Sequence, residues 1–409
     1  MHKYIVAIVI TLASASILAQ ETAIHLALNT FDEYVMDNAP RAKLIQKAYA
    51  RDVAESEASL QWRNPEFEFE AERLSNDAGT EKETAYMLGK DITMPWVHAQ
   101  HKSAQKEHLV AMEAKRDAEL LLLIAEMKSD YVELQLTNTK RERLSRLESV
   151  IDDITEYAAD QYQEGLISDL HQQLTRLSLM NIRGSLVSLK QQQRELVDQF
   201  KTDLGLGEEQ NVVLTTRIGF TPQDPARIEP ALINLEQNPE YQAHLHRQQT
   251  LKKQIALEKM SFLPEMHITG GYKEAGDDFK GYVIGLSVPL PIFDRNRPKV
   301  EQSRIDYESA VVDFEVFQRQ LNRNIHRHRE AISDYSTYFQ TNGQTFDRLD
   351  DTMENNIFAF RQGFLTIGDL VNVFMMYQET IDTYYEFLTG YYKTIFTLEA
   401  LIGESLVSF

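Results

Sequence analysis

The sequence contains no cysteine, which excludes several kinds of functional site. Without a thiol the chain can form no disulfide bond, thiolate metal centre or cysteine nucleophile, and it offers no N-terminal cysteine for a lipid anchor. Glycine and proline are also sparse, at 17 and 11 residues of 409, so few positions interrupt long helices. Lysine and arginine number 42 against 62 aspartates and glutamates, and the net charge of -20 argues against a nucleic-acid partner.

Long hydrophobic runs are missing too, apart from one near the N-terminus. There a single lysine precedes an apolar run of about a dozen residues and then small residues that end at Ala19, the pattern of a secretory signal peptide at 1–19. The mature protein is therefore expected to leave the cytoplasm. No later stretch provides the ~20 uncharged apolar residues of a membrane-spanning helix, so any membrane crossing would have to be made by β-strands.

Several landmarks recur at a nearly constant offset of 196 to 199 residues. The recurring pairs are Pro40 and Pro239, Pro65 and Pro264, Pro95 and Pro291, and Gly165 and Gly363. Such coincidences indicate duplication, so we interpret the chain as two copies of one unit, each running helix, strand, strand, long helix, turn, long helix. The predicted boundaries are 20–210 for the first repeat, 211–230 for a linker, 231–403 for the second repeat and 404–409 for a C-terminal tail.

Hydrophobic residues in the helical parts recur every ~3.5 residues, the period of a coiled coil. The longest such seam comprises Leu370, Phe374, Tyr377, Ile381, Tyr384, Leu388, Tyr391, Ile395, Leu398 and Ile402. From Val97 to Ala158 there is neither proline nor glycine, and a helix of ~60 residues there would be ~90 Å long. Helices of this length need packing partners all along them.

Four short segments alternate polar and apolar residues with a period of two, which is typical of β-strands. They lie at about 66–74, 84–94, 265–273 and 281–289. Each has the ~9–11 residues that a tilted strand needs to cross a bilayer. Because the smallest membrane barrels have about eight strands, several copies of the chain would be needed to complete one.

The first of these segments carries a row of carboxylates. Glu66, Glu68 and Glu70 alternate with Phe67 and Phe69, and they would line the lumen of a barrel whose phenylalanines face lipid. A carboxylate ring repeated by symmetry favours cations in transit. The alternative interpretation is the ordinary polar interior of a barrel, without selection of a substrate.

Three motifs make the chain resemble the TolC family of outer-membrane efflux channels over nearly all of its mature length. The most specific is GLSVPLPIFDRNRPKVEQSR, at 285–304, which is similar to the branch that serves heavy-metal and other cation exporters of the resistance-nodulation-division class. The others are the glycine turns YQEGLIS, at 162–168, and FRQGFLT, at 360–366.

The resemblance implies a mostly α fold with a small β part, in which two tandem repeats build a homotrimer. Its long coiled-coil helices would form a periplasmic α-barrel, and the four strands of each chain would contribute to an outer-membrane β-barrel. The implied function is a passive exit duct that catalyses no reaction. It would take heavy-metal cations from an inner-membrane resistance-nodulation-division pump through a periplasmic adaptor. The implied location is the bacterial outer membrane, with a long periplasmic portion.

In the family, the two glycine turns are the periplasmic tips that meet the adaptor. This role is carried here to Tyr162, Gly165, Leu166, Ser168, Phe360, Gly363, Phe364 and Thr366. The family's acidic pore constriction lies six residues after the second tip glycine, at Asp369 in this chain. Asn372 stands where some members have a second aspartate, and His171 occupies the matching offset after the first tip, so both are departures within the predicted gate.

Other interpretations of these residues are open at this stage. Asp369 could simply cap the first turn of a helix, and Gly165 and Gly363 could be C-terminal helix glycines. His98 and His101, three residues apart on a predicted helix, could hold a metal together with His108, although scattered surface histidines are the ordinary case.

At the level of the whole chain, a drug or protein-secretion duct of the same fold and a soluble periplasmic coiled-coil scaffold are the alternatives. No glycine-rich phosphate loop, nucleophile elbow or catalytic carboxylate pair stands out, so neither an enzyme nor a cofactor is predicted.

Overall fold

The computed structural model describes residues 23–76, 79–223, 235–262, 265–276 and 279–407. The predicted signal peptide, 1–19, lies outside the described residues, as do 224–230 of the predicted linker, 408–409 of the predicted tail, and Pro264 of the repeat landmarks.

The same order of elements occurs twice along the chain. The first half contains β1 (Ile24–Leu26), η1 (Leu28–Thr30), α1 (Phe31–Asn38), α2 (Pro40–Ser59), β2 (Glu66–Asn76), β3 (Gly79–Thr93), α3 (Pro95–Gln163), α4 (Asp169–Asp203) and β4 (Val212–Leu214). The second contains η4 (Leu235–Gln237), α5 (Pro239–Met260), β5 (Glu265–Ala275), β6 (Phe279–Ser287), α6 (Arg297–Asp347), α7 (Leu349–Arg361) and α8 (Ile367–Ile402). The mostly helical duplicated fold predicted from the sequence is confirmed.

The two copies differ at one point. In the first copy, α3 is a single helix of 69 residues, which corresponds to a length of about 100 Å. In the second copy the equivalent helix is interrupted at Arg348, between α6 and α7. No proline or glycine stands at this break, so local sequence did not predict it.

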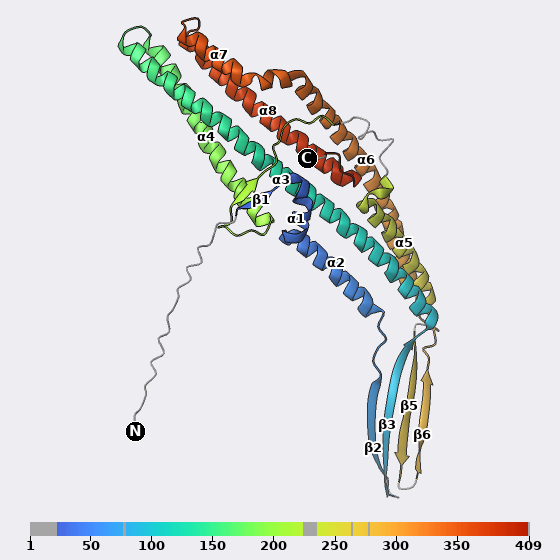
Figure 1. Cartoon of the computed structure of the whole chain (residues 1–409). Coiled ribbons are helices and arrows are strands. Elements are labelled where there is room, and N and C mark those ends of the chain that lie inside the picture. The colour runs from blue at the N-terminus through green and yellow to red at the C-terminus, as the bar shows by residue number, and fades with distance from the viewer. Residues whose placement is uncertain (1–22, 77–78, 224–234, 263–264, 277–278, 408–409) are drawn as a thin grey trace, which may run out of the picture.

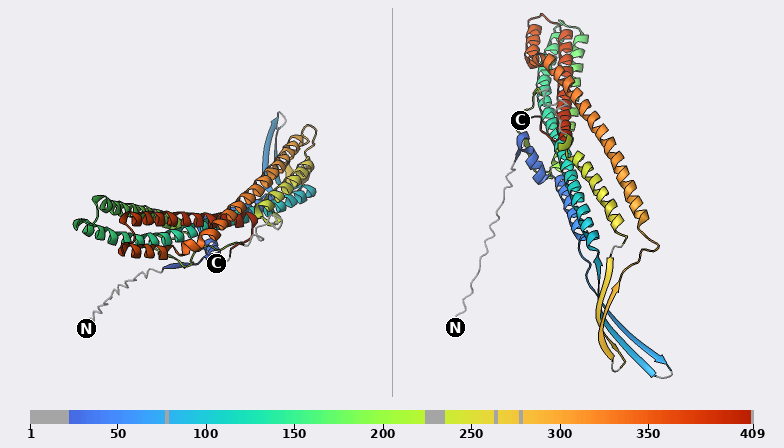
Figure 2. Two further views of the ribbon diagram at one scale, coloured as in Figure 1. Left: turned by 90° about the horizontal axis from the view of Figure 1, so that it is seen from above. Right: turned by 90° about the vertical axis from the view of Figure 1, so that its right-hand side faces the viewer.

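The molecule is a long, gently curved rod with the strands at one end (Figure 1). The turn between α3 and α4 and the turn between α7 and α8 lie together at the opposite end, and further views of the rod show the same separation (Figure 2). The long helix α3 runs from the sheet to the far tip. Among the described residues, no helix combines the length and the apolar character needed to cross a membrane.

Four antiparallel strands form the main sheet in the order β2-β3-β5-β6. The central pairing therefore joins the two repeats, because β3 of the first copy lies beside β5 of the second, with Tyr86 opposite Tyr272. Strands β2 and β6 are at the edges and have no further partner among the described residues.

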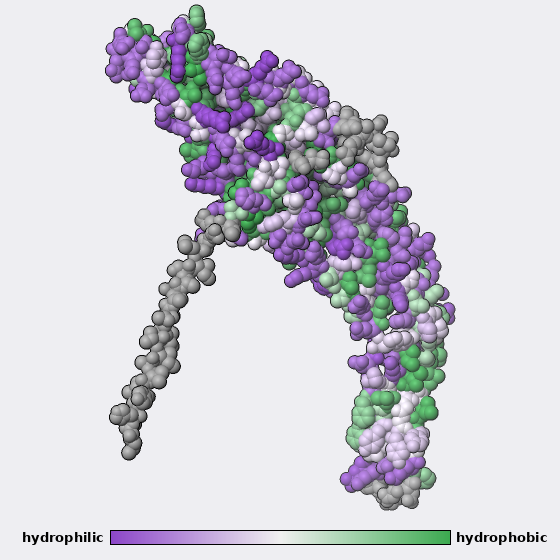
Figure 3. Space-filling view, viewed as in Figure 1, coloured by the Kyte–Doolittle hydropathy of each residue, from purple (hydrophilic) through white to green (hydrophobic). Residues whose placement is uncertain are grey.

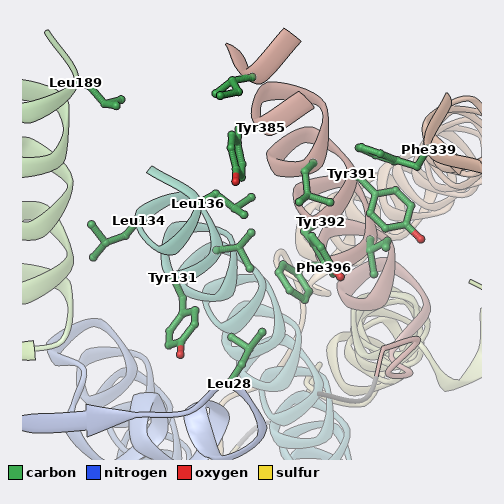
Figure 4. Close-up of a cluster of buried hydrophobic side chains, with 14 of the residues drawn as sticks. Leu28, Tyr131, Leu134, Leu136, Leu189, Phe339, Tyr385, Tyr391, Tyr392 and Phe396 are labelled. Carbon is green, nitrogen blue, oxygen red and sulfur yellow. The ribbon is translucent and has the colours of Figure 1, made fainter. Parts of the chain in front are cut away.

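The core lies between α3 and α8, where aromatic side chains gather (Figure 4). Every residue of the predicted α8 seam is buried except Tyr384, which is half-buried. The hydroxyl of the fully buried Tyr131 donates to the Leu26 carbonyl over 2.8 Å and accepts from the Thr216 amide over 3.1 Å. Residues 212–223, predicted as linker, therefore pack onto the helices.

Each repeat closes on the helix that precedes its own strands, α2 in the first copy and α5 in the second. Gly205 ends the first copy at a φ of 70°, and a Cβ there would lie 3.1 Å from Pro40, the first residue of α2. Gly403 ends the second copy at a φ of 73°, facing Pro239, the first residue of α5. Glycine suits both sites because the left-handed conformation penalises a side chain.

Candidate functional site: sheet faces and helix tips

The main sheet has two chemically distinct faces, because residues that pair across antiparallel strands share a face. The register places Phe67 opposite Leu88 and Phe69 opposite Tyr86. Across the next pairs, Ile268 lies opposite Leu286. The predicted two-residue alternation is confirmed, and most of the large apolar side chains of the four strands lie on one face, whereas Met87, Val283 and Phe279 lie on the other.

This apolar face is open. Its two most exposed members are on the edge strand β6, where Tyr282 and Ile284 are 89% and 88% exposed, and Phe67 of the other edge strand is 69% exposed. On the side of the molecule seen in Figure 3, hydrophobic residues cover much of the sheet and its junction with the helices, whereas the rod is mainly hydrophilic. A wide apolar surface of this kind marks contact with a membrane or a protein.

The opposite face carries the predicted carboxylates Glu66, Glu68 and Glu70, all exposed and all on the edge strand β2. Farther along this face, Glu83 of β3 forms an ion pair with Lys273 of β5. Much of the rest is glycine, alanine, serine or threonine.

Glycines on the polar face allow neighbouring groups to approach closely. A Cβ on Gly271 would stand 2.2 Å from the Tyr86 carbonyl oxygen, and one on Gly285 would stand 2.4 Å from the Thr269 hydroxyl. Gly270, which lies on the other face, has nothing within 4 Å of a Cβ position. The sheet is therefore crowded on its polar side and unobstructed at Gly270.

At the far end of the rod, the two tips are built alike. A glycine with a left-handed backbone follows the last turn of α3 and of α7: Gly165 at φ 73° and Gly363 at φ 80°. The following amides, of Leu166 and Phe364, donate back to carbonyls five residues earlier over 2.9 Å, the pattern of a Schellman cap. Both glycines have open space around a Cβ position, so conformation and not crowding requires them.

The predicted tip residues are mostly exposed, with one exception. Tyr162, Leu166 and Phe364 are 42%, 64% and 83% exposed. Phe360, by contrast, is only 8% exposed and packs edge-on against Tyr157 of α3, with ring centroids 5.7 Å apart. Phe360 therefore holds the two tips together instead of presenting a free surface.

Sequence reasoning missed two exposed apolar residues at the tips. Leu170, in the first turn of α4, is 66% exposed, and Phe358, in the last turn of α7, is 64% exposed. The excess of apolar residues flanking the two glycine turns was the available signal. Together with Leu166 and Phe364, they extend the apolar surface of the tips.

Asp369 is the third residue of α8, and its carboxylate completes a capping box with Thr366. It accepts hydrogen bonds from the Thr366 amide over 3.0 Å and the Thr366 hydroxyl over 2.6 Å, while the Asp369 amide donates to that hydroxyl. These bonds to the charged form lower the pKa of Asp369, so the exposed carboxylate is ionised at neutral pH. The capping interpretation is confirmed, and it leaves the negative charge facing solvent.

The other two predicted gate residues have different surroundings. His171 is the third residue of α4, and its Nδ1 lies 3.2 Å from the hydroxyl of Ser168, the residue that caps this helix. The first tip thus repeats the cap of the second with an imidazole in place of a carboxylate. Asn372 lies one turn after Asp369 and is exposed.

Ion pairs and a hydrogen bond join the α3–α4 hairpin to the α7–α8 hairpin below the tips. The sequence did not predict these contacts. Lys140 of α3 lies 2.7 Å from Asp382 of α8, and Arg143 of α3 lies 3.7 Å from Asp350 of α7. A third bond runs from the Gln378 amide of α8 to the Ser185 hydroxyl of α4, over 2.8 Å. These contacts, together called the hairpin links, oppose separation of the hairpins.

Several of the histidines contact protein side chains, including two of the three that were considered as metal ligands. The ring of His98 stacks on Trp62 with centroids 5.0 Å apart, and His101 lies 3.2 Å from the Gln105 amide nitrogen. His246 pairs with Glu107 over 3.1 Å. Within the described ranges, no group of three or more His, Cys, Asp or Glu side chains is placed to hold a metal ion.

No protein-family model matches the sequence, and no curated protein does. Solved structures match in shape. The CmeC outer-membrane channel of Campylobacter jejuni has a TM-score of 0.76 at 14% identity, over 92% of this chain and 85% of that chain. The outer-membrane protein VceC of Vibrio cholerae has a TM-score of 0.75 at 14% identity, over 93% of this chain and 97% of that chain. The MtrE outer-membrane channel of Neisseria gonorrhoeae has a TM-score of 0.72 at 12% identity, over 93% and 89%.

At these identities the comparison establishes the fold. The chain has the architecture of these outer-membrane channels, with a small sheet at one end of long paired helices. The matches extend over 92–93% of this chain.

Proposed function

We propose that the mature chain is the outer-membrane exit duct of a tripartite efflux pump, working with a periplasmic adaptor and an inner-membrane resistance-nodulation-division pump. One observation carries the proposal. A four-stranded sheet with one apolar face, one polar face and two unpaired edges is joined to a helix of about 100 Å. Unpaired edges are costly unless they are covered, and closure with copies of the same sheet covers them.

In this proposal, three copies close into a barrel through β6 of one protomer and β2 of the next. The face of Tyr282 and Ile284 would contact lipid, which suits their high exposure. Glu66, Glu68 and Glu70 would then line the lumen and favour cations. The long helices would continue the duct on the periplasmic side, and the tips would meet the adaptor through Leu166, Phe364 and their apolar neighbours.

For the cargo, we propose heavy-metal cations. The support is the resemblance of 285–304 to the cation-efflux branch, the acidic sheet face and the net charge of -20. A drug or protein-secretion duct uses the same architecture, since a passive duct takes its substrate from its pump. Export assays with a cation pump and with a drug pump, each paired with its own adaptor, would separate the two: the partner set that restores export identifies the class.

The decisive experiment combines mass and conductance. The protein should be extracted from membranes by detergent and not by a salt wash, run as a trimer by native mass spectrometry, and give cation-selective steps in a planar bilayer. A water-soluble species without conductance would instead support the periplasmic scaffold.

A second experiment tests the gate by separating the charge of Asp369 from its capping role. Asp369→Ala removes the carboxylate and its half of the capping box, whereas Thr366→Ala removes the hydroxyl that caps the Asp369 amide and keeps the carboxylate. If the charge forms the constriction, closed-state leakage of ions rises in Asp369→Ala and stays at the wild-type level in Thr366→Ala. Equal leakage in both would mean that helix capping, not the acidic ring, controls the tip.

A further inference from the structure

The segment between β6 and α6 exposes an unusual concentration of apolar surface. Leu290 is 75% exposed, Ile292 is 65% exposed and Phe293 is 99% exposed. These residues lie beyond the end of the strand, at the junction with the helical rod. We call residues 290–299 the foot.

The foot is held in a defined shape. Asn296 has a left-handed backbone, at φ 59°, and its side-chain amide donates to both the backbone carbonyl and the carboxylate of Glu258 in α5, each over 2.8 Å. The Asp294 carboxylate accepts from the Asn296 amide over 2.8 Å. Phe293 is therefore presented to solvent by a fixed turn and not by a loose loop, which preserves its exposure.

Three cations follow the apolar residues: Arg295, Arg297 and Lys299. Among the described residues none of them forms an ion pair. The nearby carboxylates have other partners: Asp294 accepts from the Asn296 backbone amide, Glu258 accepts from the Asn296 side chain, and Glu301 pairs with Arg304 over 3.6 Å. With Asp294 counted, residues 290–299 still carry two more positive than negative charges.

A local surplus of positive charge on a chain of net charge -20 indicates that the foot contacts an anionic group outside the chain. The foot also contains a hollow that lies among its charges. Phe293, Asp294, Arg295, Arg297 and Pro298 line a shallow recess of about 500 Å³. Two guanidinium groups beside an aromatic ring suit a phosphate group attached to an apolar tail, because arginine binds phosphate through paired donors.

The other strand ends at this junction carry exposed aromatic residues too. Trp62 precedes β2 and Trp96 follows β3, each 47% exposed, and Phe262 precedes β5 at 50% exposed. Aromatic residues of this kind concentrate where membrane hydrocarbon meets the headgroups. In the proposed function, the foot therefore lies at the headgroup level of the leaflet that faces the rod.

We propose that the foot binds anionic phospholipid headgroups of that leaflet, with Phe293 and Ile292 inserted into the interface and Arg295, Arg297 and Lys299 held against the phosphates. The proposal rests on the proposed function for the position of the membrane. Cations near an anionic membrane surface contribute about 1 kcal/mol each, so the three together give a preference for anionic over zwitterionic lipid on the order of 100-fold.

The test uses the purified full-length mature protein in mixed micelles that contain equal amounts of phosphatidylglycerol and phosphatidylcholine with the same acyl chains. Native mass spectrometry counts the lipids retained. The wild type should retain phosphatidylglycerol preferentially, and R295Q/R297Q/K299Q should lose this preference by on the order of 100-fold. The matched control R319Q/R323Q/R327Q removes three exposed charges farther along α6 and should keep the preference.

Four outcomes would overturn the proposal: no preference in the wild type, a preference that survives in the foot variant, equal loss in the control variant, or displacement of the lipid by inorganic phosphate. A trimer that dissociates in Phe293→Ser with lipid preference unchanged would assign the foot to contacts between copies instead. A wild type that is monomeric in detergent would count against the proposed function, while the lipid comparison would still be read on the monomer.

Discussion

The hairpin link between Lys140 and Asp382 provides a quantitative test of how the tips move. Its two side chains are 24% and 42% exposed, and they join the α3 hairpin to the α8 hairpin over 2.7 Å. If opening separates the two hairpins, this pair breaks as the duct opens. Asp382→Asn, which keeps the shape and removes the charge, should then shift the channel towards its open state.

The structure sets the size of the shift. Exposed ion pairs contribute about 0.2–1 kcal/mol, and hydrogen bonds to charged groups about 1.5–3 kcal/mol, so a half-exposed pair with a short contact is worth about 1 kcal/mol. A mutation can shift an equilibrium only by its differential effect on the two states. The ratio of open to closed occupancy should rise about fivefold if protomers open independently, and on the order of 100-fold if three open together.

The assay is single-channel recording in planar bilayers, arranged as a double-mutant cycle. Lys140→Met, Asp382→Asn and the double variant are compared with Asp351→Asn, which removes an exposed charge of α7 that has no ion pair among the described residues. The double variant should open no more than either single variant, and high salt should raise opening of the wild type more than that of the variants, in which only the Arg143–Asp350 pair remains to be screened.

The reasoning would be refuted by two results. One is an unchanged occupancy ratio in Asp382→Asn while the trimer mass stays intact. The other is additive opening by the two single variants, which would mean that the groups act separately and that the link is not broken on opening.

Three further predictions concern stability. Burial, more than the acidic neighbours of Asp130, raises its pKa to about 6. The folded state therefore binds more protons than the unfolded chain between about pH 4 and pH 6, so stability falls as pH rises through that window. Asp130→Asn should remove this fall in thermal unfolding scans. Gly271→Ala, which forces a Cβ to within 2.2 Å of the Tyr86 carbonyl, should reduce detergent-resistant trimer, whereas the adjacent Gly270→Ala should not, as gel mobility would show. Tyr131→Phe leaves the Thr216 amide without its acceptor, while the Leu26 carbonyl keeps its bonds from Thr215, and it should lower the free energy of unfolding by about 1–3 kcal/mol, measured by denaturant titration. A loss near zero would mean that water replaces the hydroxyl.

Much of the fold could be predicted because its signals are local. The α8 seam depends on apolar residues three and four positions apart, and the faces of the sheet depend on alternate residues, so each is written within a few turns or one strand. The duplication was visible because Pro40 and Pro239 begin α2 and α5, and Gly165 and Gly363 follow the ends of α3 and α7, whereas Pro95 begins α3 and its counterpart Pro291 lies between β6 and α6. Asp369 was singled out through its offset from Gly363 as a gate residue, which stays a prediction, whereas the capping role that the sequence also suggested is confirmed by the capping box with Thr366.

Other features depend on residues far apart in sequence. The partnership of β3 with β5 joins the two repeats, and the hairpin links join residues such as Lys140 and Asp382 that no local period relates. The break at Arg348 lies in a stretch without helix breakers. Phe360 looked like a tip surface residue, and its burial against Tyr157 was settled only when the two hairpins met.

The sequence by itself determined the lengths of most helices, the two faces of each strand and the positions of the turns, because backbone periodicity and turn chemistry act over a few residues. It did not determine the long-range contacts or the strand pairing. Tertiary structure alone decided which strands are neighbours, which polar groups tie the hairpins and which apolar residues remain exposed, as at Phe293. These outcomes depend on the packing of segments about two hundred residues apart, and packing selects among contacts that local patterns leave equally possible.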